Sequence, residues 1–238
     1  MYQYVNKMKQ QLDSLIKTNE NVLPDVIDLF YRAIRDDKII HILGTGHSHM
    51  IGLELFIRAG GLANVNTVLD TNVLTNGGAV RSSKLERVSG IADVIYEDLV
   101  VEKDDIFVVI SNSGRNALPL EFAMRAKKEG NKVIVLTSLE QSQKYPSRHS
   151  SGKKLYEIGD YVLDNCVPSG DGLFEVDGIT TGAASSIQGM ALLNTIVFES
   201  LKKASSEGIK LPLFASQNVD GYNNDDLYER YNGRIKHM

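Results

Sequence analysis

A short run of hydroxyl, amide and glycine residues, Ser111-Asn-Ser-Gly-Arg-Asn116, is the stretch best suited to bind an anion. It follows the unbroken apolar run 106–110 directly and precedes a helical pattern over 117–128. The first N–H groups of a helix have no partner within the helix, and the helix dipole favours negative charge there. Serine hydroxyls add donors, and Gly114 lets the backbone come close to a ligand. We therefore expect a phosphate-binding turn.

A second turn of the same kind, Gly44-Thr-Gly-His-Ser-His49, follows the apolar pattern 38–43 and precedes a helical pattern over 50–58. Its glycines permit a sharp turn, and Ser48 can donate a hydroxyl. A dinucleotide fingerprint is disfavoured because His49 stands where the third glycine belongs, and no Gly-Lys-Ser/Thr follows for a Walker loop.

Acid–base chemistry needs a carboxylate or imidazole close to these turns. Glu86 is our first candidate for a base, although it could instead complete a capping box with Ser83. His47 and His49 flank Ser48 and are the other candidates. Two residues apart, they do not share a helix face, so we expect no metal site, and we expect no cofactor.

The elements that must position these residues alternate between strand and helix patterns, which predicts a three-layer α/β/α sandwich with a mainly parallel sheet. Ligands bind such sheets beyond the carboxyl ends of the strands, where both turns lie. The expected strands are 38–43, 65–69, 106–110, 132–137 and 161–164. The expected core helices are 50–58, 84–100, 117–128 and 182–204, and Gly90 could interrupt the second of these.

The remaining segments complete one domain over 1–238. We expect a pair of N-terminal helices within 1–36, an α/β core over 37–205, and a C-terminal arm over 206–238 with a short helix at 225–235. The polar segments 72–83, 141–154 and 168–181 are expected to be loops.

Composition narrows the function further. The net charge of −4 gives no support for nucleic-acid binding, and no apolar run is long enough for a membrane span. The only cysteine, Cys166, fits a reducing compartment, and the N-terminus lacks an apolar signal core. We expect a cytoplasmic protein.

The two turns together, with a late helix beginning near Ser185, resemble the SIS (sugar isomerase) domain over roughly residues 35–205. The resemblance implies a flavodoxin-like fold of five strands, a phosphorylated sugar as ligand, and a homodimer or homotetramer. It assigns the phosphate to Ser48, Ser111 and Ser113, and close backbone approach to Gly114. Asn116 stands where the family usually has Thr or Ser. Glu86 resembles the helix-borne glutamate of family isomerases and etherases.

Three functions remain open on this reading: a phosphoheptose isomerase-like enzyme, which we favour, an etherase or lyase acting on a phosphorylated amino sugar, and a non-catalytic sugar-phosphate sensor. Arg115 could pair with phosphate or face solvent. The expected catalytic residues are Glu86, His47 and His49, and the expected phosphate-binding residues are Gly46, Ser48, Ser111, Ser113, Gly114, Arg115 and Asn116.

Overall fold

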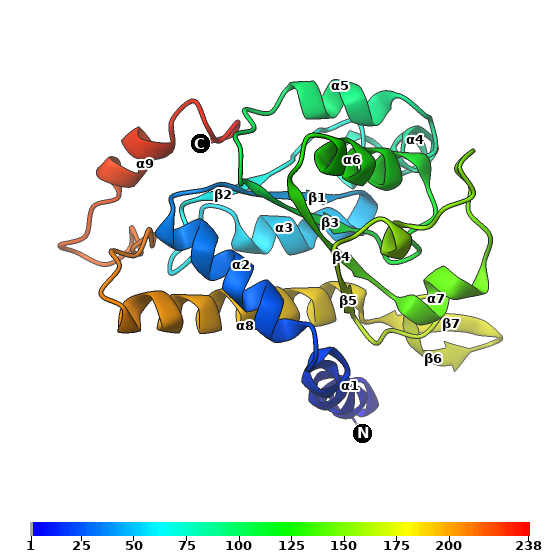
Figure 1. Ribbon diagram of the computed structural model, residues 1–238. Coiled ribbons are helices and arrows are strands. Elements are labelled where there is room, and N and C mark those ends of the chain that lie inside the picture. Colours follow the sequence, from blue (N-terminus) through cyan, green and yellow to red (C-terminus); the bar gives the residue numbers. More distant parts are fainter. Residues whose placement is uncertain (1) are drawn as a thin grey trace.

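Five parallel strands form the central sheet of the computed structural model, which describes residues 2–238 (Figure 1). The strand order is β2-β1-β3-β4-β5, the order of flavodoxin-like folds. The strands are β1 (Ile40–Gly44), β2 (Val65–Thr67), β3 (Ile106–Ile110), β4 (Lys132–Thr137) and β5 (Tyr161–Asp164). The predicted five-stranded parallel α/β fold is confirmed.

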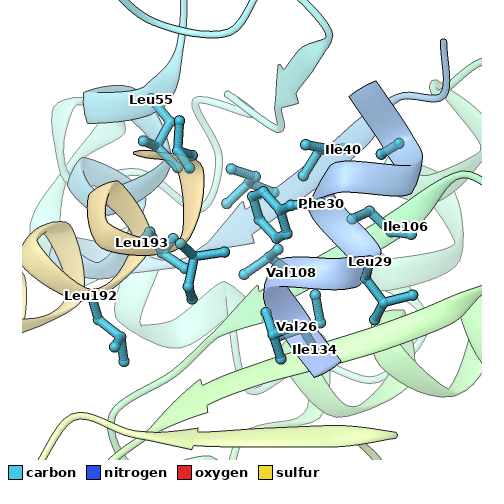
Figure 2. Packing of buried hydrophobic residues seen from close by; sticks show 14 of the residues in the cluster. Val26, Leu29, Phe30, Ile40, Leu55, Ile106, Val108, Ile134, Leu192 and Leu193 are labelled. Carbon is cyan, nitrogen blue, oxygen red and sulfur yellow. The ribbon is translucent and has the colours of Figure 1, made fainter. Parts of the chain in front are cut away.

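Helices cover both faces of this sheet, so its central strands are buried on both sides. One face carries α1 (Gln3–Asn19), α2 (Leu23–Arg35), α3 (His49–Leu55) and α8 (Ser185–Ser206), and the other carries α5 (Ile91–Glu97) and α6 (Ala117–Lys128). Figure 2 shows the first layer, where Phe30 of α2 and Leu193 of α8 pack towards Val108 of β3. The expected N-terminal helix pair is confirmed as α1 and α2.

The register of the sheet brings the two turns together. In the parallel pair β1 and β3, Gly44 stands opposite Ile110. The chain leaves both strands at the same edge, so Thr45 and Ser111 start neighbouring turns. This edge is where side chains from several segments can converge on one ligand.

The helix expected over 84–100 is interrupted at Gly90, as the sequence allowed, and its first part begins earlier than expected. The structure has α4 (Ala79–Leu85) and α5, separated by a turn in which Gly90 adopts a φ of 89°. Glu86 is therefore the residue that ends α4, and it does not lie in a capping box at a helix start. Ala79 to Ser83, expected in a loop, belong to α4.

Two other expected loops contain regular structure. Within 168–181 lies most of an antiparallel hairpin, β6 (Gly172–Val176) and β7 (Ile179–Ala183), joined at Asp177-Gly178, where both residues have positive φ. Asp-Gly favours such hairpin turns, so this signal was present in the sequence. Helix α7 (Leu139–Lys144) covers the first four residues of the segment 141–154. The Ser138 hydroxyl accepts a hydrogen bond from Gln141 N and so caps the start of this helix.

The last helix, α9 (Asp225–Tyr231), is shorter than expected. Residues following it return to the amino edge of the sheet, where Arg234 contacts Asp105, which directly precedes β3. No helix within residues 2–238 combines the length and apolar character needed to cross a membrane.

Candidate functional site

A cleft of about 290 Å³ lies at the carboxyl edge of the sheet. Its walls are the turn after β1, the turn after β3, the end of α4, the start of α7 and the two residues that precede β6. The residues lining it are Thr45, Ser48, Glu86, Ser111, Asn112, Ser113, Asn116, Gln141, Gly170 and Asp171. They come from five separate segments, so only the folded chain brings them together.

Hydrogen-bond donors without partners line one side of the cleft. Among residues 2–238, neither the Ser48 nor the Ser113 hydroxyl has a hydrogen-bond partner. The backbone N–H groups of residues 112, 113, 115 and 116 likewise donate to no described atom. A concave turn with several free N–H and hydroxyl groups is a typical anion-binding arrangement.

Ser111 has a partly different role. Its hydroxyl accepts a hydrogen bond of 3.2 Å from Gly114 N and so closes the turn, while its own proton is free for a ligand. Gly114 itself does not line the cleft. A Cβ at Gly114 would point into the protein, 3.0 Å from Ser142 Oγ and 3.2 Å from Leu155 Cβ, and its φ of 55° also favours glycine.

The earlier turn depends on Gly44. A Cβ there would lie 2.4 Å from the carbonyl oxygen of Ser48, a backbone atom of the same turn. Only glycine allows the chain to fold back this closely after β1 and to place Ser48 at the cleft.

Both carboxylate oxygens of Glu86 accept hydrogen bonds. Oε2 accepts a hydrogen bond of 2.8 Å from Thr45 Oγ1, and Oε1 accepts one of 2.7 Å from Asn116 Nδ2. The Glu86 carbonyl also accepts a 3.0 Å bond from Leu118 N at the start of α6. This carboxylate is thus held in one position between the two turns.

Burial raises the pKa of Glu86 above its ordinary value, since removing a carboxylate from water disfavours its charged form. The hydrogen bond from Thr45 acts in the opposite direction and is the weaker influence. A carboxyl group with a raised pKa at a cleft is suited to accept and return protons near neutral pH.

Five of the expected site residues therefore line the cleft: Glu86, Ser48, Ser111, Ser113 and Asn116. The other five, Gly46, Gly114, Arg115, His47 and His49, do not. The His47 side chain is exposed, and the Nδ1 atom of His49 faces the Gly46 carbonyl. The Arg115 guanidinium lies 5.4 Å from the centre of the Tyr145 ring. No group of three potential ligands among His, Cys, Asp and Glu occurs in residues 2–238.

Five cleft residues were not among those expected from the sequence: Thr45, Asn112, Gln141, Gly170 and Asp171. Thr45 was detectable, since it stands between the two glycines of the first turn. Gln141 accepts hydrogen bonds from Asn112 Nδ2 (3.1 Å) and from the N–H of residue 170 (3.2 Å), which ties two walls together. Asp171 accepts from the N–H and the hydroxyl of Ser185 and caps α8. Both roles depend on tertiary contacts that no local pattern shows.

Two comparisons with known proteins address the fold. The phosphoheptose isomerase of Neisseria gonorrhoeae superposes with a TM-score of 0.54 at 14% identity, covering 83% of this chain and 95% of that one. The Vibrio vulnificus NanR protein, complexed with ManNAc-6P, gives a TM-score of 0.54 at 18% identity, covering 86% of this chain and 63% of that one. At these identities the similarity concerns the fold.

Sequence similarity is higher to bacterial proteins named UPF0309. That of Halalkalibacterium halodurans, BH0227, is 38% identical over 98% of this chain and 94% of its own length. That of Caldanaerobacter subterraneus subsp. tengcongensis, TTE0306, is 35% identical over 99% and 98%. The family model described as SIS domain matches residues 3–138, more than half of the chain. As its two turns predicted, the chain belongs to the SIS domain family.

Proposed function

We propose that the cleft binds the phosphate group of a phosphorylated sugar and that the protein isomerises this sugar. The observation that carries the proposal is the placement of the free hydroxyls of Ser48 and Ser113 in the same cleft as the half-buried carboxyl group of Glu86. The two hydroxyls are suited to hold a phosphate dianion, and the carboxyl group is suited to transfer a proton.

The phosphate would be bound by hydrogen-bond donors alone, because no lysine or arginine is among the described residues that line the cleft. Three hydroxyl donors and the free N–H groups of residues 112, 113, 115 and 116 supply enough hydrogen bonds for the oxygens of one phosphate. The N-terminal end of α6, twelve residues long, adds a favourable dipole. The similarity to a phosphoheptose isomerase in fold supports this choice of ligand class.

In our proposal Glu86 is the residue that transfers the proton. In an aldose–ketose isomerisation, a base takes the proton from the carbon next to the carbonyl and returns it to the former carbonyl carbon, while the hydroxyl proton moves between the two oxygens. Glu86 would take and return the carbon-bound proton. Thr45 and Asn116 would hold the carboxylate in place between the two steps.

We also infer a homodimer or homotetramer, in keeping with the family resemblance. Helices α3 and α8 pack against each other beside the cleft and carry several exposed apolar side chains. These are Met50, Leu53, Ile187 and Phe198. Light scattering coupled to size-exclusion chromatography measures the mass directly, and a monomer at micromolar concentration would contradict this inference.

Thermal shift with a panel of phosphosugars, followed by turnover assays, tests the proposed function. We expect sedoheptulose 7-phosphate, fructose 6-phosphate or an amino-sugar phosphate to raise the melting temperature, because a ligand of the folded state stabilises it. The E86Q variant should bind the same sugar and lose turnover by about 100-fold or more. Binding without turnover by the wild type would overturn the isomerase assignment, and binding unaffected by S113A would overturn the phosphate site.

A further inference from the structure

The arginines of this protein divide into two groups. Six of the ten form ion pairs with carboxylates; these are Arg32, Arg35, Arg58, Arg125, Arg230 and Arg234. Within residues 2–238 the other four have no carboxylate at ion-pair distance; these are Arg81, Arg87, Arg115 and Arg148. Arg81 lies in α4 and Arg87 just after it, Arg115 lies in the turn after β3, and Arg148 lies in a segment that contacts this turn.

Three of them lie next to residues that line the cleft. Arg87 follows Glu86 in the chain, and Arg115 stands between Ser113 and Asn116. Arg148 approaches from a different segment: its Nη1 donates a hydrogen bond of 3.0 Å to Asn116 Oδ1. The backbone of Arg148 also donates a 2.9 Å bond to the carbonyl of Arg115, which fixes the two segments together. The three arginines, 87, 115 and 148, are called the arginine rim below.

The rim concentrates positive charge, and within residues 2–238 none of its guanidinium groups forms an ion pair with a carboxylate. Burial and the positive charges of Arg115 and Arg87 lower the pKa of Arg148. The charge of Glu86 acts on Arg148 and Arg87 from beyond ion-pair distance, while its oxygens accept hydrogen bonds from Thr45 and Asn116. The Arg115 Nε atom is buried without a hydrogen-bond partner in the described residues. Donors left unused in this way are suited to an anionic ligand.

The rim is separate from the phosphate site of the proposed function. None of its guanidinium groups lines the cleft, whose donors are hydroxyls and backbone N–H groups. Asn116 lies between the two: its side chain lines the cleft and accepts from Arg148. A ligand phosphate on the serines would therefore leave the rim free for a second negative group on the same molecule.

We propose that the arginine rim binds a second anionic group of the ligand, so that the preferred substrate class is a phosphorylated sugar carrying a further carboxylate or phosphate. This inference rests on the proposed function for the first phosphate. Guanidinium groups bind both carboxylate and phosphate through paired N–H donors, so the rim alone does not choose between the two.

Isothermal titration of the wild-type protein with three probes tests the proposal: glucose 6-phosphate, 6-phosphogluconate and glucose 1,6-bisphosphate. The first has one anionic group, the second adds a carboxylate, and the third adds a phosphate. We expect one of the doubly anionic probes to bind about ten- to a hundredfold more tightly than glucose 6-phosphate, the gain typical of hydrogen bonds to charged groups. The probe that binds more tightly shows whether the second anionic group is a carboxylate or a phosphate.

The R148Q and R87Q variants should lose this gain and keep their affinity for glucose 6-phosphate within about twofold. R81Q is the matched control, because Arg81 is also unpaired with a carboxylate but contacts Asn72 instead of the rim. Melting temperatures of all variants check that they fold. Equal affinities for the three probes, absent binding of all three, or equal losses in R81Q and R148Q would overturn the inference.

The same data separate the two proposals. S113A should weaken all three probes if the proposed phosphate site is right. If S113A changes nothing while R148Q abolishes binding of a doubly anionic probe, the phosphate site is wrong and the rim stands. If S113A weakens every probe and R148Q weakens none selectively, the phosphate site stands and the rim is wrong.

Discussion

Asn116 Nδ2 donates a hydrogen bond of 2.7 Å to Glu86 Oε1, and this contact joins the turn after β3 to the end of α4. The Oδ1 atom of the same Asn116 amide accepts a hydrogen bond from Arg148. In our proposal the side chain of Asn116 holds Glu86, while its backbone N–H remains a donor for the phosphate. A side chain that fixes a proton-transfer group also tunes its pKa, and this can be measured.

Replacing Asn116 by aspartate places a second carboxylate beside Glu86. A neighbouring like charge disfavours ionisation, so the pKa of Glu86 should rise further and the acid limb of the pH–rate profile should move upwards by about one pH unit. N112D is the control, since Asn112 lines the same cleft and hydrogen-bonds Gln141 instead of Glu86. An unchanged acid limb in N116D, or an equal change in both variants, would contradict the assignment of Glu86.

The raised pKa of Glu86 also predicts a pH-dependent difference in stability. Between the ordinary and the raised pKa the folded protein binds a proton that the unfolded chain has released, so this group's contribution to the free energy of unfolding falls as the pH rises. E86Q removes this titration. The stability of E86Q relative to wild type should therefore increase as the pH rises above about 4.3, the ordinary pKa of a glutamate, as measured by urea unfolding. The exposed Glu229 supplies a control variant, E229Q. A relative stability of E86Q that decreases over this range would show that the sign is wrong.

The two serines of the later turn should respond differently to alanine. S111A leaves the buried N–H of Gly114 without its acceptor and should cost about 1–3 kcal/mol of unfolding free energy. S113A removes a hydroxyl without an intramolecular partner, so its stability should stay within about 0.5 kcal/mol of wild type while phosphosugar affinity falls. Urea unfolding and titration on the same samples separate the effects. Equal destabilisation by both substitutions would contradict the hydrogen-bond pattern of the turn.

Alanine substitutions at two glycines of the first turn, Gly44 and Gly46, compare the effect of a steric clash with the effect of backbone strain. G44A places a Cβ 2.4 Å from the Ser48 carbonyl oxygen and should cost about 1–3 kcal/mol while displacing Ser48 and weakening ligand binding. G46A introduces no contact within 4 Å, but it strains a residue with φ of 54°, which costs about 1 kcal/mol. Thermal unfolding and titration compare the two. Ligand affinity in G44A equal to that in G46A would show that close packing of this turn does not position Ser48.

Asp105 anchors the C-terminal segment at the opposite edge of the sheet. Burial opposes its ionisation, but hydrogen bonds from His41 and from the N–H groups of residues 102 and 39 outweigh this effect and lower the pKa of Asp105. Its stabilising contribution is therefore present at neutral pH and is lost as the pH falls below about 4. D105N leaves Arg234 without its buried partner and should cost about 3 kcal/mol at pH 7.

The matched control for this ion pair is D37N. Asp37 pairs with Arg230 at a site where both side chains are more than 40% exposed, so its loss should cost less than about 1 kcal/mol. Urea unfolding at pH 7 compares the two variants. Similar losses in D105N and D37N would mean that burial of the Asp105 pair contributes little.

Local patterns were sufficient for the five strands of the parallel sheet and for both turns. The run 106–110 is apolar at every position because β3 is buried on both faces, and such a run has few alternatives in a soluble protein. The segment 79–97 was harder to predict, because its polar and apolar residues fit one interrupted helix or two short ones. The break at Gly90 was foreseen, but the start of α4 at Ala79 was not.

The sequence by itself determined the parallel α/β sheet and the two glycine–hydroxyl turns, because burial on both faces and tight turns each demand particular residue types at adjacent positions. Only the tertiary structure decided which polar residues face one another. The contacts of Glu86 with Asn116, of Arg148 with Asn116 and of Gln141 with Asn112 span 25 or more residues. They follow from strand order and register, which bring distant segments to one edge of the sheet.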